Sequence, residues 1–257
     1  MQRSQGRCHL AFKLSEGRTI LDRLHEDGCA KIRFPEPDQA ILINTAGGLT
    51  GGDDLSWSIV VPADGTVTIT TQASEKIYRA IEPTVARVAT RIVLGPSARL
   101  HWLPQETILF NHSAVERTFD IELSAGSSFL GVEAVVFGRA AMGEAMEHVR
   151  LHDRWRIWRD RRLVHAEDLR VDGSPKELLA RAAIGAGNTA FATLLLFSED
   201  AERFRDAVSN VVGEAGAASA FDGKLLARVA TVDAYELRKT VIGAIAALSG
   251  GSALPKV

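Results

Sequence analysis

Between residues 8 and 169 the chain consists of short segments in which apolar and polar residues alternate with a period of two. Each segment stops at Gly, Pro, Asn or Asp, and such segments are typical of strands with one buried face. We therefore predict a body of short antiparallel strands, including those at residues 9–14, 39–44, 55–61, 66–72, 88–94 and 117–123. The segment 66–72 is the strongest of these, because its side chains branched at Cβ suit a pleated surface.

From residue 173 onward the pattern changes to Ala-rich segments with helical periodicity, and strands are predicted at residues 192–197 and 224–231. A helix is predicted over residues 199–212, with Ser198 as its N-cap and Gly213 as its terminator. Its apolar face is expected to contain Ala201, Phe204, Val208 and Val211.

A second helix is predicted over residues 234–248, where Asp233 and Glu236 have the spacing of a capping box. Its apolar stripe is Leu237, Val241, Ile245 and Leu248. A short helix is also predicted to begin near Ser174, since Ser can cap a helix and the following Pro fits its first turn.

Together these elements predict one mainly β domain over residues 1–257, with two C-terminal α-helices. The β body covers about residues 8–172, and the α+β part covers about residues 173–250. We find no repeat of fixed period and no low-complexity tract, and the longest linker-like stretch, residues 213–223, is too short to separate independent domains.

Composition and charge narrow the range of possible functions and compartments. The 30 Lys and Arg residues nearly balance the 32 Asp and Glu residues, so no general electrostatic attraction to nucleic acid is expected. The two cysteines, Cys8 and Cys29, form neither a disulfide framework nor a zinc motif, which makes the cytoplasm the expected compartment. The most apolar stretch, residues 178–197, is interrupted by Arg and Gly, and no membrane segment or export signal is predicted.

Two polar loops stand out. The first, residues 44–53, contains Gly47, Gly48, Gly51 and Gly52 and ends at Asp53, but it lacks the Lys of a phosphate-binding P-loop. It is either a tight turn that brings two strands together or a loop that packs on a partner or lines a passage. The second, residues 70–79, is either a solvated strand end or a functional segment, with Thr70, Thr71, Gln72 and Glu75 as its candidates.

Two further segments carry charged candidates. Residues 102–110 place Glu106 between apolar flanks, where a carboxylate is either exposed or paired. Residues 137–144 place Arg139 and Glu144 in a Gly-flanked loop, where they can pair with each other. The candidate metal ligands are His148, His152 and Asp153, near Glu144 and Glu147. The spacing of the two histidines is a weak metal-site signal, and scattered surface histidines are the commoner explanation.

No Ser, Cys or Thr lies in a nucleophile elbow, so the residues alone give no recognisable catalytic set. Three function classes stay open at this point: a scaffold or maturation factor, a β-rich module that binds a small ligand, and an uncharacterised hydrolase or transferase. Turnover by the isolated chain would favour the enzyme, and binding to a partner protein would favour the scaffold.

The four segments resemble motifs of the UreD family of urease accessory proteins, also called UreH. The matching stretches, in order along the chain, are NTAGGLTGGD (44–53), TTQASEKIYR (70–79), WLPQETILF (102–110) and FGRAAMGE (137–144), followed by WRI (155–157) and DGKLLAR (222–228). They occur in the family's order with similar spacing and cover most of the chain from about residue 28 onward. His101 departs from the acidic residue expected before the third motif.

This resemblance implies a non-catalytic maturation factor with a β-helix-like body, which acts with UreF and the GTPase UreG on apo-urease and helps to install nickel. It implies no tightly bound cofactor, only nickel in transit through an interior passage. We expect the carboxylates along that passage to be among those in or beside the motifs, namely Asp53, Glu75, Glu106, Glu133 and Glu144. The alternative for each of them is a structural role, capping a turn or pairing with Arg79 or Arg139.

Overall fold

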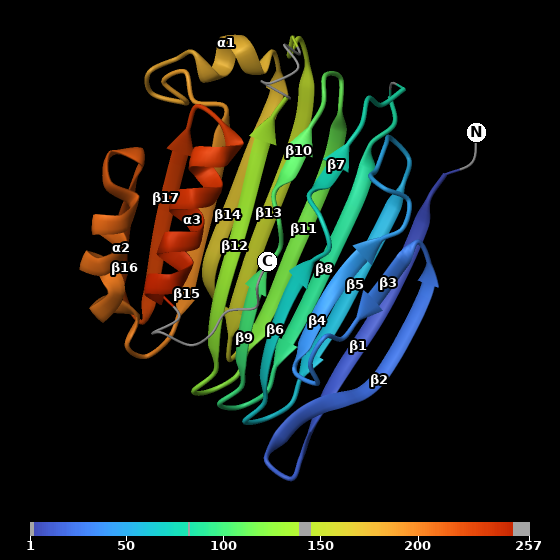
Figure 1. Ribbon diagram of the computed structural model, residues 1–257, viewed down its shortest axis with the longest axis vertical. Coiled ribbons are helices and arrows are strands. Elements are labelled where there is room, and N and C mark those ends of the chain that lie inside the picture. The colour runs from blue at the N-terminus through green and yellow to red at the C-terminus, as the bar shows by residue number, and fades with distance from the viewer. Residues whose placement is uncertain (1–2, 82, 139–144, 249–257) are drawn as a thin grey trace.

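The computed structural model describes residues 3–81, 83–138 and 145–248, and their strands form two sheets of seven and ten strands (Figure 1). The first sheet contains, in spatial order, β14 (Arg162–Gly173), β13 (Val149–Arg159), β11 (Ala114–Leu123), β8 (Ala86–Leu94), β5 (Asp54–Val61), β1 (Gln5–Ser15) and β2 (Arg18–Gly28). The second contains, in spatial order, β16 (Gly216–Phe221), β17 (Lys224–Thr231), β15 (Ala190–Phe197), β12 (Ser128–Phe137), β9 (Arg99–Leu103), β6 (Thr66–Thr71), β4 (Gln39–Asn44) and β3 (Ala30–Arg33). Its two short strands lie off this path: β10 (Thr107–Leu109) pairs with β12, and β7 (Glu75–Ile77) pairs with β10.

The strands at the centre of both sheets are parallel, so the prediction of antiparallel strands is wrong there. In the first sheet β1, β5, β8, β11 and β13 run parallel, and in the second β4, β6, β9 and β12 do. Antiparallel pairs occur toward the edges, as in β1 with β2 and β13 with β14. Alternation reports that one face of a strand is buried, and it carries no information on strand direction.

Parallel neighbours arise because the chain winds in coils from one sheet to the other. One coil runs through β6, β7 and β8, the next through β9, β10 and β11, and the next through β12 and β13. This arrangement confirms the β-helix-like fold. The coils begin at residues 66, 99 and 128, so their lengths differ, and the sequence consequently shows no repeat of fixed period.

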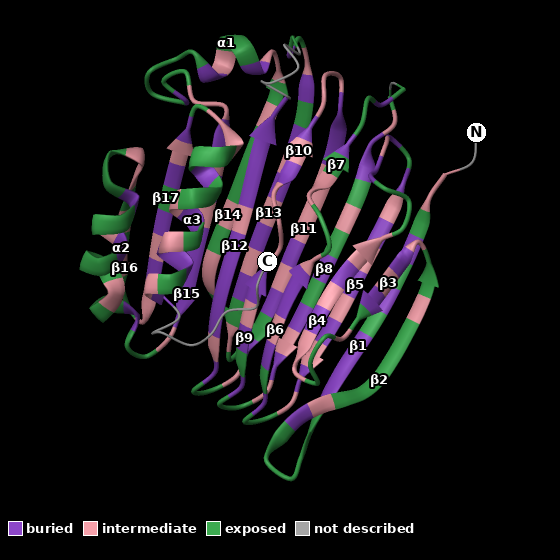
Figure 2. Cartoon of the chain, in the orientation of Figure 1, coloured by how far each residue is buried: buried purple, intermediate pink, exposed green. Residues whose placement is uncertain are grey.

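The main hydrophobic core lies between the two sheets. On β5 every second residue is buried, namely Leu55, Trp57, Ile59 and Val61, as the alternation predicts. Aromatic side chains from both sheets meet there: the rings of Trp102 and Phe119 are 5.2 Å apart, and those of Phe119 and Trp155 are 4.6 Å apart. Figure 2 shows the difference between the buried centre, exemplified by β12, and the exposed edge strand β2.

The C-terminal part continues the ten-stranded sheet and covers its outer face. Helices α2 (Arg205–Val212) and α3 (Ala234–Leu248) bury a second cluster against β12, β15 and β17 (Figure 1). The predicted stripe of α3 is confirmed, since Leu237, Val241, Ile245 and Leu248 are all buried. Its predicted cap is also confirmed, because the Glu236 backbone N–H donates to Asp233 Oδ1 at 2.9 Å.

The predicted helix over residues 199–212 needs correction. It is split into a 3₁₀ turn, η2 (Ala201–Phe204), followed by α2, and Ser198 is not its N-cap, because its hydroxyl donates to Asp200 Oδ1 at 2.5 Å. Within α2 the apolar face continues from Val208 to Val212, which is buried, and not to Val211, which is 40% exposed. Residues 213–223, expected to be linker-like, contain strand β16.

The short helix predicted at Ser174 is confirmed as α1 (Pro175–Leu179). Ser174 is its N-cap, and its side chain accepts a hydrogen bond from the Glu177 backbone N–H. None of the helices in the described part of the chain is long and apolar enough to span a bilayer.

Candidate functional site

The four motif segments lie side by side at one corner of the coils. Backbone hydrogen bonds connect them in sequence order: Leu49 N to Lys76 O at 2.8 Å, Phe110 N to Ile77 O at 3.0 Å and Gly138 N to Leu109 O at 2.8 Å. Each bond joins one coil to the next. The motifs, separated in sequence by 16 or more residues, therefore form one continuous structural feature.

The Gly-rich loop packs against its own chain. Gly48 is buried with a φ of 143°, and a Cβ atom there would lie 2.7 Å from the Lys76 carbonyl oxygen. Asp53 is buried at the end of the loop, where its two carboxylate oxygens accept from the backbone N–H groups of Ser4 and Thr50, each at 2.8 Å. These contacts are those of a tight turn where the chain passes from β4 in one sheet to β5 in the other.

The polar residues after β6 form hydrogen bonds to the third motif. The Thr70 hydroxyl donates to Leu103 O at 2.8 Å, and the Thr71 hydroxyl accepts from Gln105 N at 2.9 Å. The Gln105 side chain donates to Gln72 O at 3.3 Å. The Thr70 and Thr71 hydroxyls thus hold the end of β6 to the next coil, whereas Gln72 is exposed and takes part only through its backbone carbonyl.

Glu106 is bound to the helical layer, since both of its carboxylate oxygens accept from Arg238 Nη2 of α3 at 2.8 Å. Glu75 is instead held inside the body, where Asn44 Nδ2 donates to its two oxygens at 3.1 and 3.3 Å. Burial raises the pKa of Glu75 to about 7, although the hydrogen bonds from Asn44 act in the opposite direction. The surroundings of Glu75 therefore favour its neutral form.

A buried guanidinium lies close to Glu75 between the sheets. Arg117 of β11 donates to Thr107 Oγ1 at 2.8 Å and to Asp153 Oδ2 at 2.5 Å, and it also forms a short ion pair with Glu133. We call these four residues the Arg117 cluster. Burial alone would lower the pKa of Arg117, but the two carboxylates raise it, so the guanidinium stays charged.

The two carboxylates of the Arg117 cluster have raised pKa values. Burial disfavours the ionised form of both Glu133 and Asp153, and the positive charge of Arg117 only partly offsets this effect. Two carboxylates share one cation here, so the cluster takes up a proton more readily than isolated side chains would. It is a polar, titratable centre between the two sheets.

Two cavities meet at this cluster. The smaller has a volume of about 90 Å³ and is lined by residues that include Glu75, Thr107 and Arg117. The larger has a volume of about 370 Å³ and opens between β14 and β17. Glu133, Asp153 and Trp155 line both cavities, so the two carboxylates form part of the shared wall.

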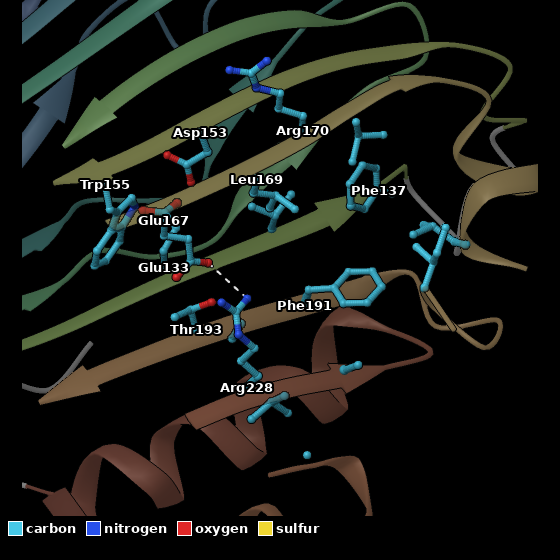
Figure 3. A pocket seen from close by; sticks show the side chains of 18 of the residues that line it. Glu133, Phe137, Asp153, Trp155, Glu167, Leu169, Arg170, Phe191, Thr193 and Arg228 are labelled. Atoms are coloured by element: carbon cyan, nitrogen blue, oxygen red, sulfur yellow. Dashed lines mark ion pairs between the residues drawn. The ribbon is translucent and has the colours of Figure 1, made fainter. Parts of the chain in front are cut away.

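The larger cavity is polar at one end and apolar at the other (Figure 3). Asp153, Glu133 and Glu167 gather near Trp155, whereas Phe137, Leu169 and Phe191 lie toward the opposite end. Arg228 Nη1 is 3.1 Å from Glu167 Oε1, an ion pair that joins β17 to β14 across the two sheets. Burial alone would raise the pKa of Glu167, but His165 and Arg228 together lower it, so this carboxylate stays ionised.

Arg117 and Glu167 were absent from the sequence-based candidates, and Asp153 was considered only as a metal ligand beside His148 and His152, although the sequence carries a burial signal for Arg117 and Asp153. Arg117 shares its strand face with Phe119 and Ile121, and Asp153 alternates in phase with Leu151 and Trp155. A charged residue in the apolar phase of an alternating strand must be buried and paired, since an unpaired buried charge is very costly. No comparable pattern marks Glu167, because the edge strand β14 alternates poorly.

The remaining candidates lie elsewhere. His148 and His152 pair with different residues, Asp172 at 3.5 Å and Asp168 at 2.9 Å, so the structure does not bring the two histidines to a common site. Across residues 3–81, 83–138 and 145–248 there is no group of three His, Cys, Asp or Glu side chains arranged to hold a metal ion. Arg139 and Glu144, with their predicted ion pair, lie outside the described residues.

The raised pKa of Glu75 gives a pH-dependent stability prediction. A carboxyl whose pKa rises from 4.5 to about 7 on folding destabilises the fold once it ionises, so this contribution to stability is lost as the pH increases through that range. We expect Glu75→Gln to increase the free energy of unfolding by roughly 2 kcal/mol at pH 8 and to have little effect near pH 4.5.

Urea denaturation at both pH values measures this difference. Glu199→Gln is the matched control, because Glu199 is exposed and its substitution should change stability by less than about 0.5 kcal/mol at either pH. Equal effects of Glu75→Gln at the two pH values would mean that Glu75 is not a titrating buried group.

Comparison with known proteins gives a consistent result. Residues 4–256 match the family described as UreD urease accessory protein. The whole chain is 47% identical to the urease accessory protein UreD of Agrobacterium fabrum, over 91% of that protein's length. It is 49% identical to the UreD of Rhizobium leguminosarum bv. viciae over 95% of its length, and 46% identical to that of Mesorhizobium japonicum over 94%.

Proposed function

This chain belongs to the UreD family of urease accessory proteins, and we propose that it is the scaffold through which nickel reaches the active site of apo-urease. In this proposal it acts in the cytoplasm in a complex with UreF and UreG. GTP hydrolysis belongs to UreG, and this chain contributes binding surfaces and a path for the ion. It needs no tightly bound cofactor and performs no catalysis of its own.

The observation that carries the proposal is the pair of interior cavities that adjoin at Glu133 and Asp153. A divalent cation that leaves water requires anionic or carbonyl oxygen in compensation. The interior supplies such oxygens in series, from Glu75 through the Arg117 cluster to Glu167. Several weak positions in series suit transfer, because an ion bound too tightly at one position would not leave it.

Four of the five candidate carboxylates lie in the described residues, and their contacts favour two of them for this path. Glu75 lines the smaller cavity and Glu133 lines both cavities. Asp53 holds two backbone N–H groups, and Glu106 is paired with Arg238, so their contacts support the structural alternative. We therefore propose Glu75 and Glu133 as positions where nickel pauses in transit.

The proposal is tested in a strain that carries the urease genes but lacks this chain. We expect its urease to assemble but to contain little nickel and to be inactive, because the subunits themselves are unchanged. Urease is purified, its nickel content is measured by mass spectrometry, and its activity is compared with that of a strain complemented with the intact gene.

A normal nickel content in the deletion strain would contradict the proposal. Co-purification of the tagged chain with apo-urease provides an independent control, because a scaffold must bind its client. If the isolated chain instead turns over a substrate and does not bind apo-urease, the enzyme interpretation is favoured.

A further inference from the structure

The guanidinium of Arg117 occupies a position suited to a small cation. Its terminal nitrogens contact Thr107 Oγ1, Glu133 Oε1 and Asp153 Oδ2, three oxygens that come from three strands of the two sheets. Only 10% of the Arg117 side chain is exposed, and the two carboxylates are 18% and 7% exposed. The positive charge is thus enclosed by an oxygen shell.

The same oxygen shell matches the preferences of a divalent cation. Carboxylate and hydroxyl oxygens are ligands for hard and intermediate divalent ions, which bind more tightly as the number of anionic ligands increases. Without Arg117, Glu133 and Asp153 would be two adjacent carboxylates in a weakly solvated interior, where opposite charges attract more strongly than in water. An ion that reached them would be held.

The hydrogen bonds of Arg117 are incomplete, which favours displacement of its guanidinium from the two carboxylates by a metal ion. Its two terminal nitrogens are bonded, whereas none of the described residues accepts a hydrogen bond from its Nε. A buried N–H group without an acceptor costs free energy. Arg117 is therefore held in place mainly by its ion pairs with the two carboxylates, because its set of hydrogen bonds is incomplete. Glu133 and Asp153 also face both cavities, which gives an ion access from either side.

We propose that Arg117 is a tethered counter-cation that competes with divalent metal for Glu133 and Asp153 and keeps this pair from retaining the ion. The inference rests on the proposed nickel path for its biological meaning, but the competition itself is a property of the isolated chain. The alternative is that Arg117 only cross-links the sheets. In that case its removal weakens the fold without creating metal affinity.

The test measures nickel binding by the purified full chain and its variants. Each protein is incubated with NiCl₂, desalted, and analysed for retained nickel, and its dissociation constant is determined by calorimetry. We expect Arg117→Gln to bind nickel at least about tenfold more tightly than the unaltered chain and to retain about one ion per molecule. Arg117→Lys, which keeps the charge, should behave like the unaltered chain.

A double variant, Arg117→Gln with Asp153→Asn, identifies the ligands. It should lose the new affinity, because one of the two carboxylates is gone. If Arg117→Gln folds and binds nickel no better than the unaltered chain, or if the double variant keeps the affinity, the proposal is overturned.

The removal of a buried cation can also prevent folding. Arg117→Gln is therefore refolded with and without NiCl₂. Recovery of the fold by nickel in Arg117→Gln, but not in the double variant, supports the proposal, and failure to recover in nickel overturns it. These measurements need no urease, so they are independent of the deletion experiment that tests the nickel path.

Discussion

Replacement of Glu133 by Gln is expected to reduce urease activation by about tenfold or more, while the complex with UreF and apo-urease still assembles. Gln has nearly the same shape as Glu, and its amide oxygen can still accept from Arg117. Asp153 still balances the charge of Arg117. The substitution therefore removes the negative charge that both cavities share and leaves the fold largely intact.

The measurement is urease activity and nickel content in the complemented deletion strain, together with co-purification of the tagged variant. Glu199→Gln is the control, since it removes a carboxylate from an exposed position that lines neither of the two cavities. Full activation by Glu133→Gln would exclude this carboxylate from the path. A variant that fails to assemble would instead assign Glu133 a structural role.

A large effect on stability is expected at Gly48. Its φ of 143° disfavours any residue with a Cβ atom, and that atom would lie 2.5 Å from Tyr78 Cε2 and 2.7 Å from Lys76 O. The Lys76 carbonyl cannot withdraw easily, because Leu49 and the segment 76–78 are joined by backbone hydrogen bonds of 2.8 and 2.7 Å. We expect Gly48→Ala to lower the free energy of unfolding by about 3 kcal/mol.

Gly47→Ala is the matched control for this prediction. Gly47 also has a positive φ, 75°, but a Cβ atom there would meet nothing within 4 Å, so only the backbone penalty of about 1 kcal/mol applies. Urea denaturation of both variants separates the two effects. Equal losses would show that the loop moves away from Tyr78 without cost, which would favour a loop that adapts to a partner over a tight internal turn.

The sequence by itself determined the class of fold and the position of most elements. Alternation located the inward face of β5, and capping residues located α1 and α3. These features are local, because one buried face or one helix cap depends on residues only a few positions apart. The six motif stretches identified the family for the same reason, since they are contiguous in the chain.

The direction of the strands and the composition of the candidate site were decided only by the tertiary structure. Parallel pairing arises because each coil returns the chain to the same sheet. The coils differ in length, so no local pattern in the sequence predicts where the chain returns. The break between η2 and α2 likewise depends on how the segment packs against the sheet.

The Arg117 cluster shows most clearly how far the sequence alone can predict the candidate site. The sequence places Arg117 and Asp153 on inward strand faces, but only the parallel register of β11 and β13 sets these two residues side by side. Glu133 joins them from the opposite sheet. Whether a buried charge destabilises the fold or forms a binding site depends on which charges surround it. These neighbours become known only when the two sheets are packed together.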